Sequence, residues 1–203
     1  MKICVYGAAS KTISPEHIKN IEFLGKRLAE RGHSLVFGGG ANGAMGAVAR
    51  GVKSVNNTKI VGIIPTFFNV DGVLFNGCTE VLYTDTMRER KRLLEDLSDA
   101  FIITPGGVGT FDEFFEILSL KQLARMNKPI VIYNSLGYYD PLIKMLDNAV
   151  KGNFMSAKNF TLFNVTDDVE KVFEYIESYN SEKTVKLSEL KDVTFELENE
   201  TTE

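Results

Sequence analysis

The sequence is poor in the residues that build disulfide frameworks and many metal or catalytic centres. It has no tryptophan, two cysteines and two histidines among its 203 residues. Cys4 and Cys78 are too few for a disulfide framework and lack metal-ligand spacing, so both are expected to be plain thiols. His17 and His33 lie near the ends of the first expected helix among charged neighbours, and we expect both at the surface. A histidine-based triad or a histidine-rich zinc site therefore has little material, and no metal site is expected.

Long apolar runs and an excess of positive charge are also missing. No stretch approaches the roughly 20 apolar residues that cross a bilayer, and the first residues predict a strand instead of a signal peptide. We therefore expect a cytoplasmic protein with no membrane partner. Residues 182–203 hold seven acidic residues and three lysines, which accounts for the net charge of -4 and leaves the rest of the chain about neutral. This balance gives no support to a nucleic-acid partner.

Short β-branched or aromatic runs alternate with helical patterns along the chain. Strands are expected near 2–7, 34–38, 59–64, 79–83, 99–104, 129–133 and 160–164, and helices near 15–31, 43–54, 86–97, 110–126, 138–151 and 167–179. The runs at 101–103 and 129–133 are apolar without alternation, as in parallel strands that helices cover on both faces. The pattern predicts an α/β fold with a doubly wound, mostly parallel, Rossmann-like sheet and helices on both faces.

The domain organisation follows from the same pattern. Residues 1–180 are expected to form a single Rossmann-like nucleotide-binding catalytic domain, and residues 181–203 an acidic C-terminal appendage. Within the appendage, residues 193–197 alternate like a short edge strand.

Residues 98–113 run from an apolar strand through a glycine-rich turn into a helix. Gly106, Gly107 and Gly109 let the backbone approach a ligand closely, and the first N–H groups of the following helix lack intrahelical acceptors. Such a helix start binds phosphate. Glu113, one turn into the helix, places a carboxylate beside whatever the phosphate is attached to. Thr110 and Glu113 also have the spacing of a capping box, in which the carboxylate would reach back to the backbone instead.

A second glycine cluster, residues 38–46, follows the strand at 34–38 and contains the pattern GxGxxG. A dinucleotide site would also want an acidic residue about 20 positions further on, and none occurs before Asp71. An NAD-dependent oxidoreductase is therefore a weaker hypothesis. The glycines of either cluster alone could also serve only tight turns and close helix packing.

The helix expected from Thr86 carries two cations on an apolar stripe. Thr86 and Glu89 have capping-box spacing, and helical periodicity puts Met87, Arg90, Lys91 and Leu94 on one side. The usual interpretation of such a run is a solvated charged face. Here the stripe indicates that both cations face a pocket, where an anion or the Glu113 carboxylate could pair with them. Asp112 and Glu116 are expected on a solvated side of their own helix.

These motifs resemble the Lonely Guy family of cytokinin riboside 5′-monophosphate phosphoribohydrolases, whose older label is "possible lysine decarboxylase". Residues 105–113 resemble the family's PGGxGTxxE and residues 87–91 its MHxRK, in the same order. The resemblance spans roughly residues 2–180 and implies that Glu113 and Arg90 are the catalytic pair. It also implies a nucleotide site lined by Met87, Lys91, Gly39, Gly40, Gly43, Gly106, Gly107, Val108, Gly109 and Thr110, with Ser10 as a substitute contact.

Three departures accompany this resemblance. Arg88 stands at the family's usual histidine, residues 43–46 replace its GLMG, and residues 6–9 replace its CGSS, with Ser10 following. Arg88 lies in the motif that resembles MHxRK, and the other two departures lie in the second glycine cluster and the first loop, so the PGGxGTxxE motif is untouched.

The chemistry implied by the family is hydrolysis of the N-glycosidic bond of AMP or N6-modified adenine nucleoside 5′-monophosphates, giving free base and ribose 5-phosphate. A carboxylate at Glu113 could stabilise positive charge on the sugar or activate water, as acids do in glycoside hydrolysis. No cofactor is expected, and the resemblance implies a homodimer. The alternative from another class is a non-catalytic carrier of a nucleotide or the molybdenum cofactor. A lysine decarboxylase has no support from the residues, because no pyridoxal phosphate site is identified.

Overall fold

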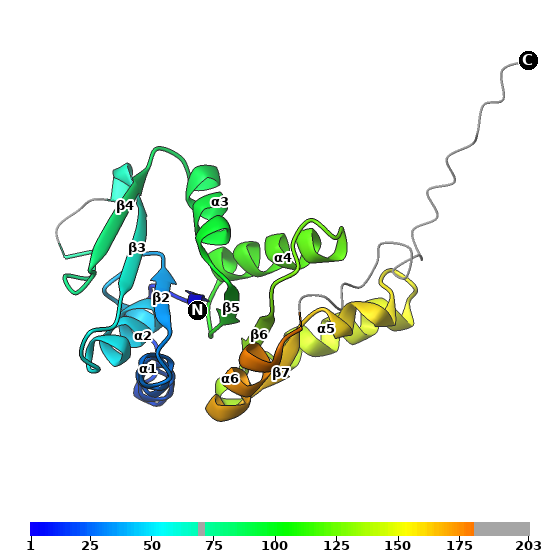
Figure 1. The fold of residues 1–203 in the computed structure, drawn as a ribbon. Coiled ribbons are helices and arrows are strands. Elements are labelled where there is room, and N and C mark those ends of the chain that lie inside the picture. The colour runs from blue at the N-terminus through cyan, green and yellow to red at the C-terminus, as the bar shows by residue number, and fades with distance from the viewer. Residues whose placement is uncertain (69–71, 181–203) are drawn as a thin grey trace, which may run out of the picture.

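The computed structural model of the chain describes residues 1–68 and 72–180 (Figure 1). Seven strands form one sheet in the order β4-β3-β2-β1-β5-β6-β7, and each neighbouring pair is parallel. The strands are β1 (Lys2–Tyr6), β2 (Ser34–Phe37), β3 (Ile60–Pro65), β4 (Glu80–Thr84), β5 (Ala100–Ile103), β6 (Ile130–Tyr133) and β7 (Asn164–Thr166). The helices are α1 (Pro15–Glu30), α2 (Gly43–Lys53), α3 (Met87–Leu97), α4 (Val108–Gln122), α5 (Asp140–Lys151) and α6 (Val169–Ser178). The predicted doubly wound parallel sheet is confirmed.

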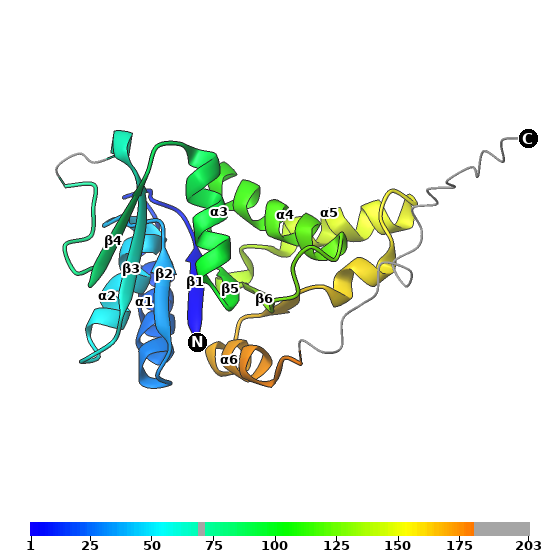
Figure 2. The same cartoon turned by 45° about the horizontal axis from the view of Figure 1, so that its top comes forward.

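The chain winds outward from the centre of the sheet twice. It first runs from β1 to β4 on one side, then returns to β5, beside β1, and continues to β7 on the other side. The point between β1 and β5 is the topological switch, and ligands of such sheets bind outside the strand ends there. Figures 1 and 2 show α1 and α2 together on one face and α3 and α4 on the other.

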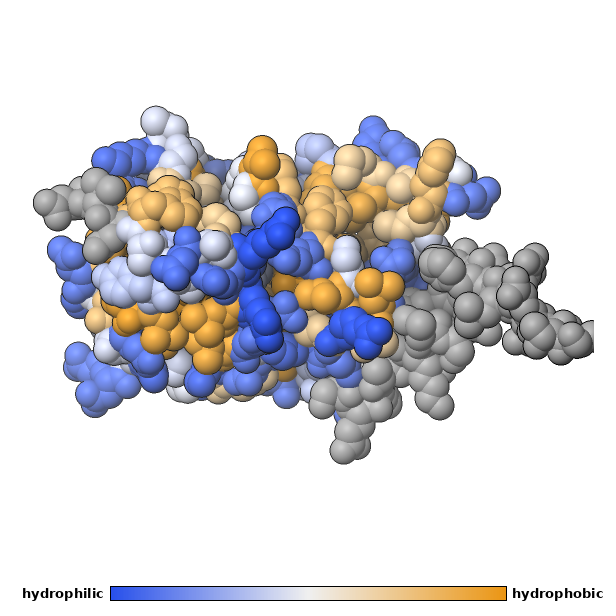
Figure 3. Space-filling view, turned by 90° about the horizontal axis from the view of Figure 1, so that it is seen from above, coloured by the Kyte–Doolittle hydropathy of each residue, from blue (hydrophilic) through white to orange (hydrophobic). Residues whose placement is uncertain are grey.

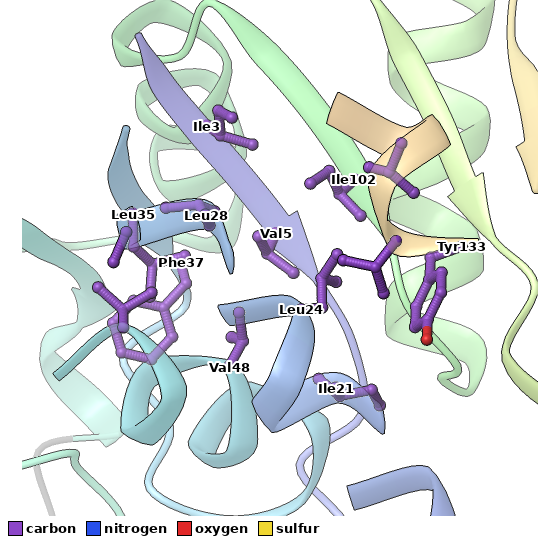
Figure 4. Close-up of a cluster of buried hydrophobic side chains, with 14 of the residues drawn as sticks. Ile3, Val5, Ile21, Leu24, Leu28, Leu35, Phe37, Val48, Ile102 and Tyr133 are labelled. Carbon is purple, nitrogen blue, oxygen red and sulfur yellow. The ribbon is translucent and has the colours of Figure 1, made fainter. Parts of the chain in front are cut away.

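The residues of β1 show why helices are needed on both faces. Ile3 and Val5 enter a core with α1, α2 and α6, whereas Cys4 and Tyr6 enter a second core with α3, α4 and α5. Successive strand residues point to opposite faces, so a strand that is apolar throughout must be covered twice. Figure 4 shows the first core, where Leu24 of α1 and the strand residues Val5 and Ile102 are labelled.

Two glycines bring α1 and α2 into backbone contact. A Cβ at Gly25 would overlap the carbonyl oxygen of Val48, and a Cβ at Gly51 would overlap that of Glu22. Only glycine permits an approach this close. The position of α2, which begins directly after the first glycine loop, is therefore fixed against α1.

A partly exposed ion-pair network joins the end of α1 to α6. Glu170 accepts from Arg27 Nε at 2.7 Å and from Arg31 Nη2 at 2.6 Å, while Arg31 Nη1 lies 2.7 Å from a carboxylate oxygen of Glu177. Hydrogen bonds from Arg27 and then Arg31 lower the pKa of Glu170 to about 2. We call Arg27, Arg31, Glu170 and Glu177 the α1–α6 network.

Some local expectations were wrong. The strand expected at 160–164 is instead a 3-10 turn at Ala157–Thr161 followed by β7 at Asn164–Thr166. The apolar run packs into the second core through Leu162 and Phe163 and not through a sheet face. His33 is buried, with Nε2 3.0 Å from Glu177 Oε1, and His17 is half-buried. The predicted appendage, including the strand at 193–197, lies outside the described residues.

No helix in the described part of the chain is long and apolar enough to cross a membrane.

Candidate active site

The candidate site lies at the carboxyl edge of the sheet, beside the switch point between β1 and β5. Figure 3 views the molecule from the side where Figure 1 draws the start of α3, and it shows strongly hydrophilic surface between two apolar areas. The loops after β1 and β5 are joined there, since Ala8 N donates to Pro105 O at 3.2 Å and Thr104 Oγ1 donates to Tyr6 O at 2.8 Å. Met45 N of the other glycine cluster donates to Ala8 O at 3.3 Å, so both glycine clusters contact the loop after β1.

Arg90 is placed by the start of α3 and held in a buried position. The predicted capping box is present: Thr86 Oγ1 accepts from Glu89 N at 3.2 Å, and Glu89 Oε2 accepts from Thr86 N at 3.1 Å. Arg90 Nε donates to the Ile63 carbonyl oxygen at 3.2 Å, and Nη1 donates to Glu113 Oε1 at 3.1 Å. A Cβ at Gly38 would overlap Arg90 Nη2, so the guanidinium lies against the end of β2.

Glu113 does not form the capping box considered as the alternative for it. Helix α4 starts at Val108 after an extended Gly107, so Thr110 is already inside the first turn and does not cap it. Glu113 instead lies on the side of α4 that faces Arg90, whose Nη1 donates to its Oε1. The ion pair between them is the structural outcome, and it joins α3 to α4.

The surroundings of Glu113 bring its ionisation into the neutral range. Burial raises the pKa of the Glu113 carboxyl to about 7, and the positive charge of Arg90 only partly opposes this rise. Desolvation disfavours the charged form of a carboxyl, and a neighbouring cation favours it. A base with a pKa near the working pH is well suited to proton transfer.

The start of α4 presents an open glycine turn. Gly107 and Gly109 are exposed, and a Cβ added at either would meet no atom within 4 Å. Val108 between them is also exposed. Gly106 differs, because a Cβ there would overlap the side chain of the buried Thr110. No side chain caps the helix at Gly107, so its first N–H groups remain for an anionic ligand.

The first glycine loop requires glycine for conformational reasons. Gly39 and Gly43 have φ values of +76° and +61°. A Cβ at Gly43 would also overlap the Ala8 carbonyl oxygen and lie 2.7 Å from that of Ser10. Phe75 N donates to Gly39 O at 2.9 Å and braces the loop from outside. The close approach of Gly43 to the Ala8 and Ser10 carbonyls brings Ser10 next to the start of α2. Ser10 is exposed, and its hydroxyl lies 2.9 Å from Thr12 Oγ1. Gly40 is buried beside them.

Lys91 is paired with carboxylates that we expected to be solvated. Its Nζ lies 3.0 Å from Asp112 Oδ2 and 2.9 Å from Glu116 Oε2. The spacing of these two acids, four residues apart on α4, could have revealed a shared cation partner. Arg90 and Lys91 thus bind different acids of α4, and Met87 is exposed at the start of α3.

Two tyrosines at this edge were not identified from the sequence. Tyr138 OH donates to the Gly106 carbonyl oxygen at 2.7 Å, and Tyr139 OH donates to that of Thr104 at 2.8 Å. Both residues follow β6, so their place at the carboxyl edge was the available clue. Within residues 1–68 and 72–180, His, Cys, Asp and Glu form no cluster suited to a metal ion.

A doubly wound parallel sheet with two glycine loops and a buried Arg–Glu pair at its switch point defines a Rossmann-like protein with a candidate anion site. The model of the family described as "Possible lysine decarboxylase" matches residues 45–176. The chain is 37% identical over 171 residues to the cytokinin riboside 5′-monophosphate phosphoribohydrolase of Mycobacterium tuberculosis, covering 83% of this chain and 89% of that protein. The chain therefore belongs to this family, as its resemblance to the Lonely Guy proteins predicts.

Further relatives carry the same name. The chain is 36% identical to the enzyme of Rhodococcoides fascians, over 77% of this chain and 79% of that protein. It is also 36% identical to the enzyme of Oryza sativa, over 76% of this chain and 64% of that protein.

Solved structures of similar fold include carriers. The molybdenum cofactor carrier protein of Chlamydomonas reinhardtii has a TM-score of 0.65 at 20% identity, covering 87% of this chain and 95% of that chain. The molybdenum cofactor binding protein of Rippkaea orientalis has a TM-score of 0.61 at 19% identity, covering 87% and 94%. At this identity the likeness establishes the fold alone.

Proposed function

We propose that the protein is a phosphoribohydrolase that cleaves the N-glycosidic bond of AMP or N6-modified adenine nucleoside 5′-monophosphates. The observation that carries the proposal is the buried carboxyl of Glu113, with its pKa raised to about 7, beside Arg90 and one turn from an open anion site. The names of the relatives at 36–37% identity support the same substrate class.

In the proposed reaction, a water oxygen forms a bond to C1′ as the bond from C1′ to the base nitrogen breaks. The ionised carboxylate of Glu113 accepts a proton from the water and stabilises the positive charge that develops on the sugar. The departing base nitrogen takes up a proton from solvent and Glu113 later releases its proton to solvent, so the reaction consumes one water and no net proton. The products are the free base and ribose 5-phosphate.

Other residues position the reacting atoms. Arg90 holds Glu113 through Nη1 while Nε is fixed to the end of β3, so the carboxylate is held from one side. The N–H groups at Gly107, Val108 and Gly109 bind the 5′-phosphate, a group that does not react. Binding energy at a remote group then orients the sugar for attack.

The wider proposal includes a cytoplasmic homodimer that needs no cofactor. The dimer and the compartment follow from the family resemblance and the composition. Light scattering of the full chain tests the dimer, and a mass of about 22.6 kDa, that of a single chain, would contradict it.

The decisive experiment incubates the purified chain with AMP and with isopentenyladenosine 5′-monophosphate and measures release of free base and ribose 5-phosphate. Glu113→Ala and Arg90→Ala are expected to lower kcat/KM by about 100- to 10,000-fold. Glu170→Gln is the matched control, because it removes another arginine-paired carboxylate far from the site.

Absence of base release from a panel of monophosphates would refute the enzyme. Undiminished release by both site variants would show that the residue assignment is wrong. Retention of a nucleotide or the molybdenum cofactor through gel filtration, without turnover, would favour the carrier.

A further inference from the structure

The glycine turn between β5 and α4 is held by its carbonyl oxygens. Thr104 O accepts from Tyr139 OH at 2.8 Å, Pro105 O accepts from Ala8 N at 3.2 Å, and Gly106 O accepts from Tyr138 OH at 2.7 Å. Three successive carbonyls therefore each accept a hydrogen bond from a donor in another part of the chain.

The consequence for the N–H groups follows from the geometry of the peptide bond. In a planar trans peptide, the C=O of one residue and the N–H of the next point in opposite directions. Fixing the Gly106 carbonyl against Tyr138 therefore turns the N–H of Gly107 the other way. Gly107 is exposed, with open space where a Cβ would stand.

The segment that carries Tyr138 is itself firmly held. Asn134 Oδ1 accepts from Tyr139 N at 2.7 Å, and the Ser135 hydroxyl lies 3.3 Å from His17 Nδ1 of α1. Leu136 has a φ of +56°, in the left-handed region, which is costly for a leucine. Backbone in this region persists only where the surroundings enforce it, so the contacts around it give Tyr138 a defined position.

We propose that Tyr138 is a positioning residue for the phosphate of the substrate, acting through the Gly106–Gly107 peptide. The inference rests on the proposed function, because it assigns the ligand of that turn as the 5′-phosphate. Tyr139 has the same kind of bond but is fully buried beneath the turn, whereas Tyr138 is 41% exposed at its rim. Removing the hydroxyl of Tyr138 therefore frees the Gly106 carbonyl and leaves the core intact.

The test compares Tyr138→Phe with Tyr179→Phe. Both changes delete one hydroxyl that donates a 2.7 Å hydrogen bond, but the bond of Tyr179 goes to Asn127 Oδ1, away from the turn. Tyr138→Phe is expected to raise KM for the monophosphate about 3- to 10-fold with kcat within twofold, the range one net hydrogen bond allows. Tyr179→Phe should leave both constants unchanged.

Inorganic phosphate provides a readout that does not depend on turnover. Its dissociation constant, measured by calorimetry on the full chain, is expected to rise by the same 3- to 10-fold in Tyr138→Phe and to stay constant in Tyr179→Phe. Unchanged phosphate affinity in Tyr138→Phe would overturn the inference, as would an equal loss in both variants. If the wild-type chain binds phosphate with this pattern but releases no base, the proposed reaction fails and the positioning role stands.

Discussion

Two carboxyl groups that pair with arginine in this fold have pKa values shifted in opposite directions. The Glu113 side chain is 11% exposed and has one arginine partner, and its pKa is raised to about 7. The Glu170 side chain is 41% exposed and has two arginine partners, and its pKa is lowered to about 2. Both carboxylates accept hydrogen bonds from arginine, so an arginine partner alone does not decide whether the pKa is raised or lowered.

The difference shows that burial sets the behaviour of Glu113. For a buried carboxylate, the free-energy cost of losing its hydration exceeds the attraction of one neighbouring guanidinium. A carboxylate that stays partly exposed keeps its hydration and is further stabilised by its cationic partners. The α1–α6 network therefore contains an acid that stays charged throughout the neutral and mildly acidic range and joins two helices. The buried pair contains an acid that exchanges protons near neutrality.

The largest expected consequence concerns stability against pH. The pKa of Glu113 in the folded chain, about 7, lies above its ordinary value of 4.5. The native state therefore binds more protons in this window, and the free energy of unfolding falls as pH rises from 4.5 to 7. The loss attributable to Glu113 is about 3 kcal/mol. Urea unfolding at pH 4.5 and pH 8 should show this loss of unfolding free energy in wild type and not in Glu113→Gln.

Glu170→Gln is the contrasting variant for this measurement. In wild type the pKa of Glu170 is lowered on folding, so the stability that its carboxylate contributes is present above pH 4.5 and is lost as pH falls toward 2. Equal pH slopes for wild type and Glu113→Gln between pH 4.5 and 8 would contradict the raised pKa.

Activity should follow the same ionisation. If the carboxylate form of Glu113 accepts the proton from water, kcat/KM falls about tenfold for each pH unit below 7 and levels off above it. The profile of kcat/KM between pH 5 and 9 measures this, with the Tyr179→Phe variant expected to keep the same midpoint. A rate that instead declines as pH rises through 7 would mean that the protonated acid is the working form.

The smallest expected effect belongs to the α1–α6 network. Glu170→Gln should lower the free energy of unfolding at pH 7 by less than about 1 kcal/mol, because exposed pairs contribute little. The effect should shrink further in 1 M NaCl, where charges are screened over a few ångströms. Denaturant unfolding at low and high salt measures both quantities, and a loss that does not respond to salt would argue for packing instead of charge.

The alternation of apolar strand runs with helical patterns was enough to predict the sheet, and helix periodicity put Arg90 on a stripe where an anion or Glu113 could pair with it. The capping box at Thr86 set the phase of α3, and that phase put Arg90 on the inner stripe. The first residue of α4 was less certain from the sequence, because threonine is a common N-cap residue and Thr110 has capping-box spacing to Glu113. The extended Gly107, which starts the helix earlier, depends on the contacts of the whole turn.

The contacts that span long stretches of sequence could not be predicted. Tyr138 and Gly106 are 32 residues apart, and His33 and Glu177 are 144 apart. Local patterns carry no information on such pairs, since they arise only when strands and helices are assembled. Lys91 is an intermediate case. Helix periodicity predicted its place on the apolar stripe of α3, but the sequence did not predict its pairing with Asp112 and Glu116 of α4.

The close packing of α1 on α2 has a consequence for how the protein tolerates mutation. Alanine at Gly25 or Gly51 would place a methyl group against a backbone carbonyl that has no room to yield, so α2 would have to slide or tilt. Because α2 begins at Gly43, its displacement would carry the first glycine loop with it. A search for inactive variants should therefore find substitutions at these two glycines, on the face of the sheet opposite the Arg90–Glu113 pair.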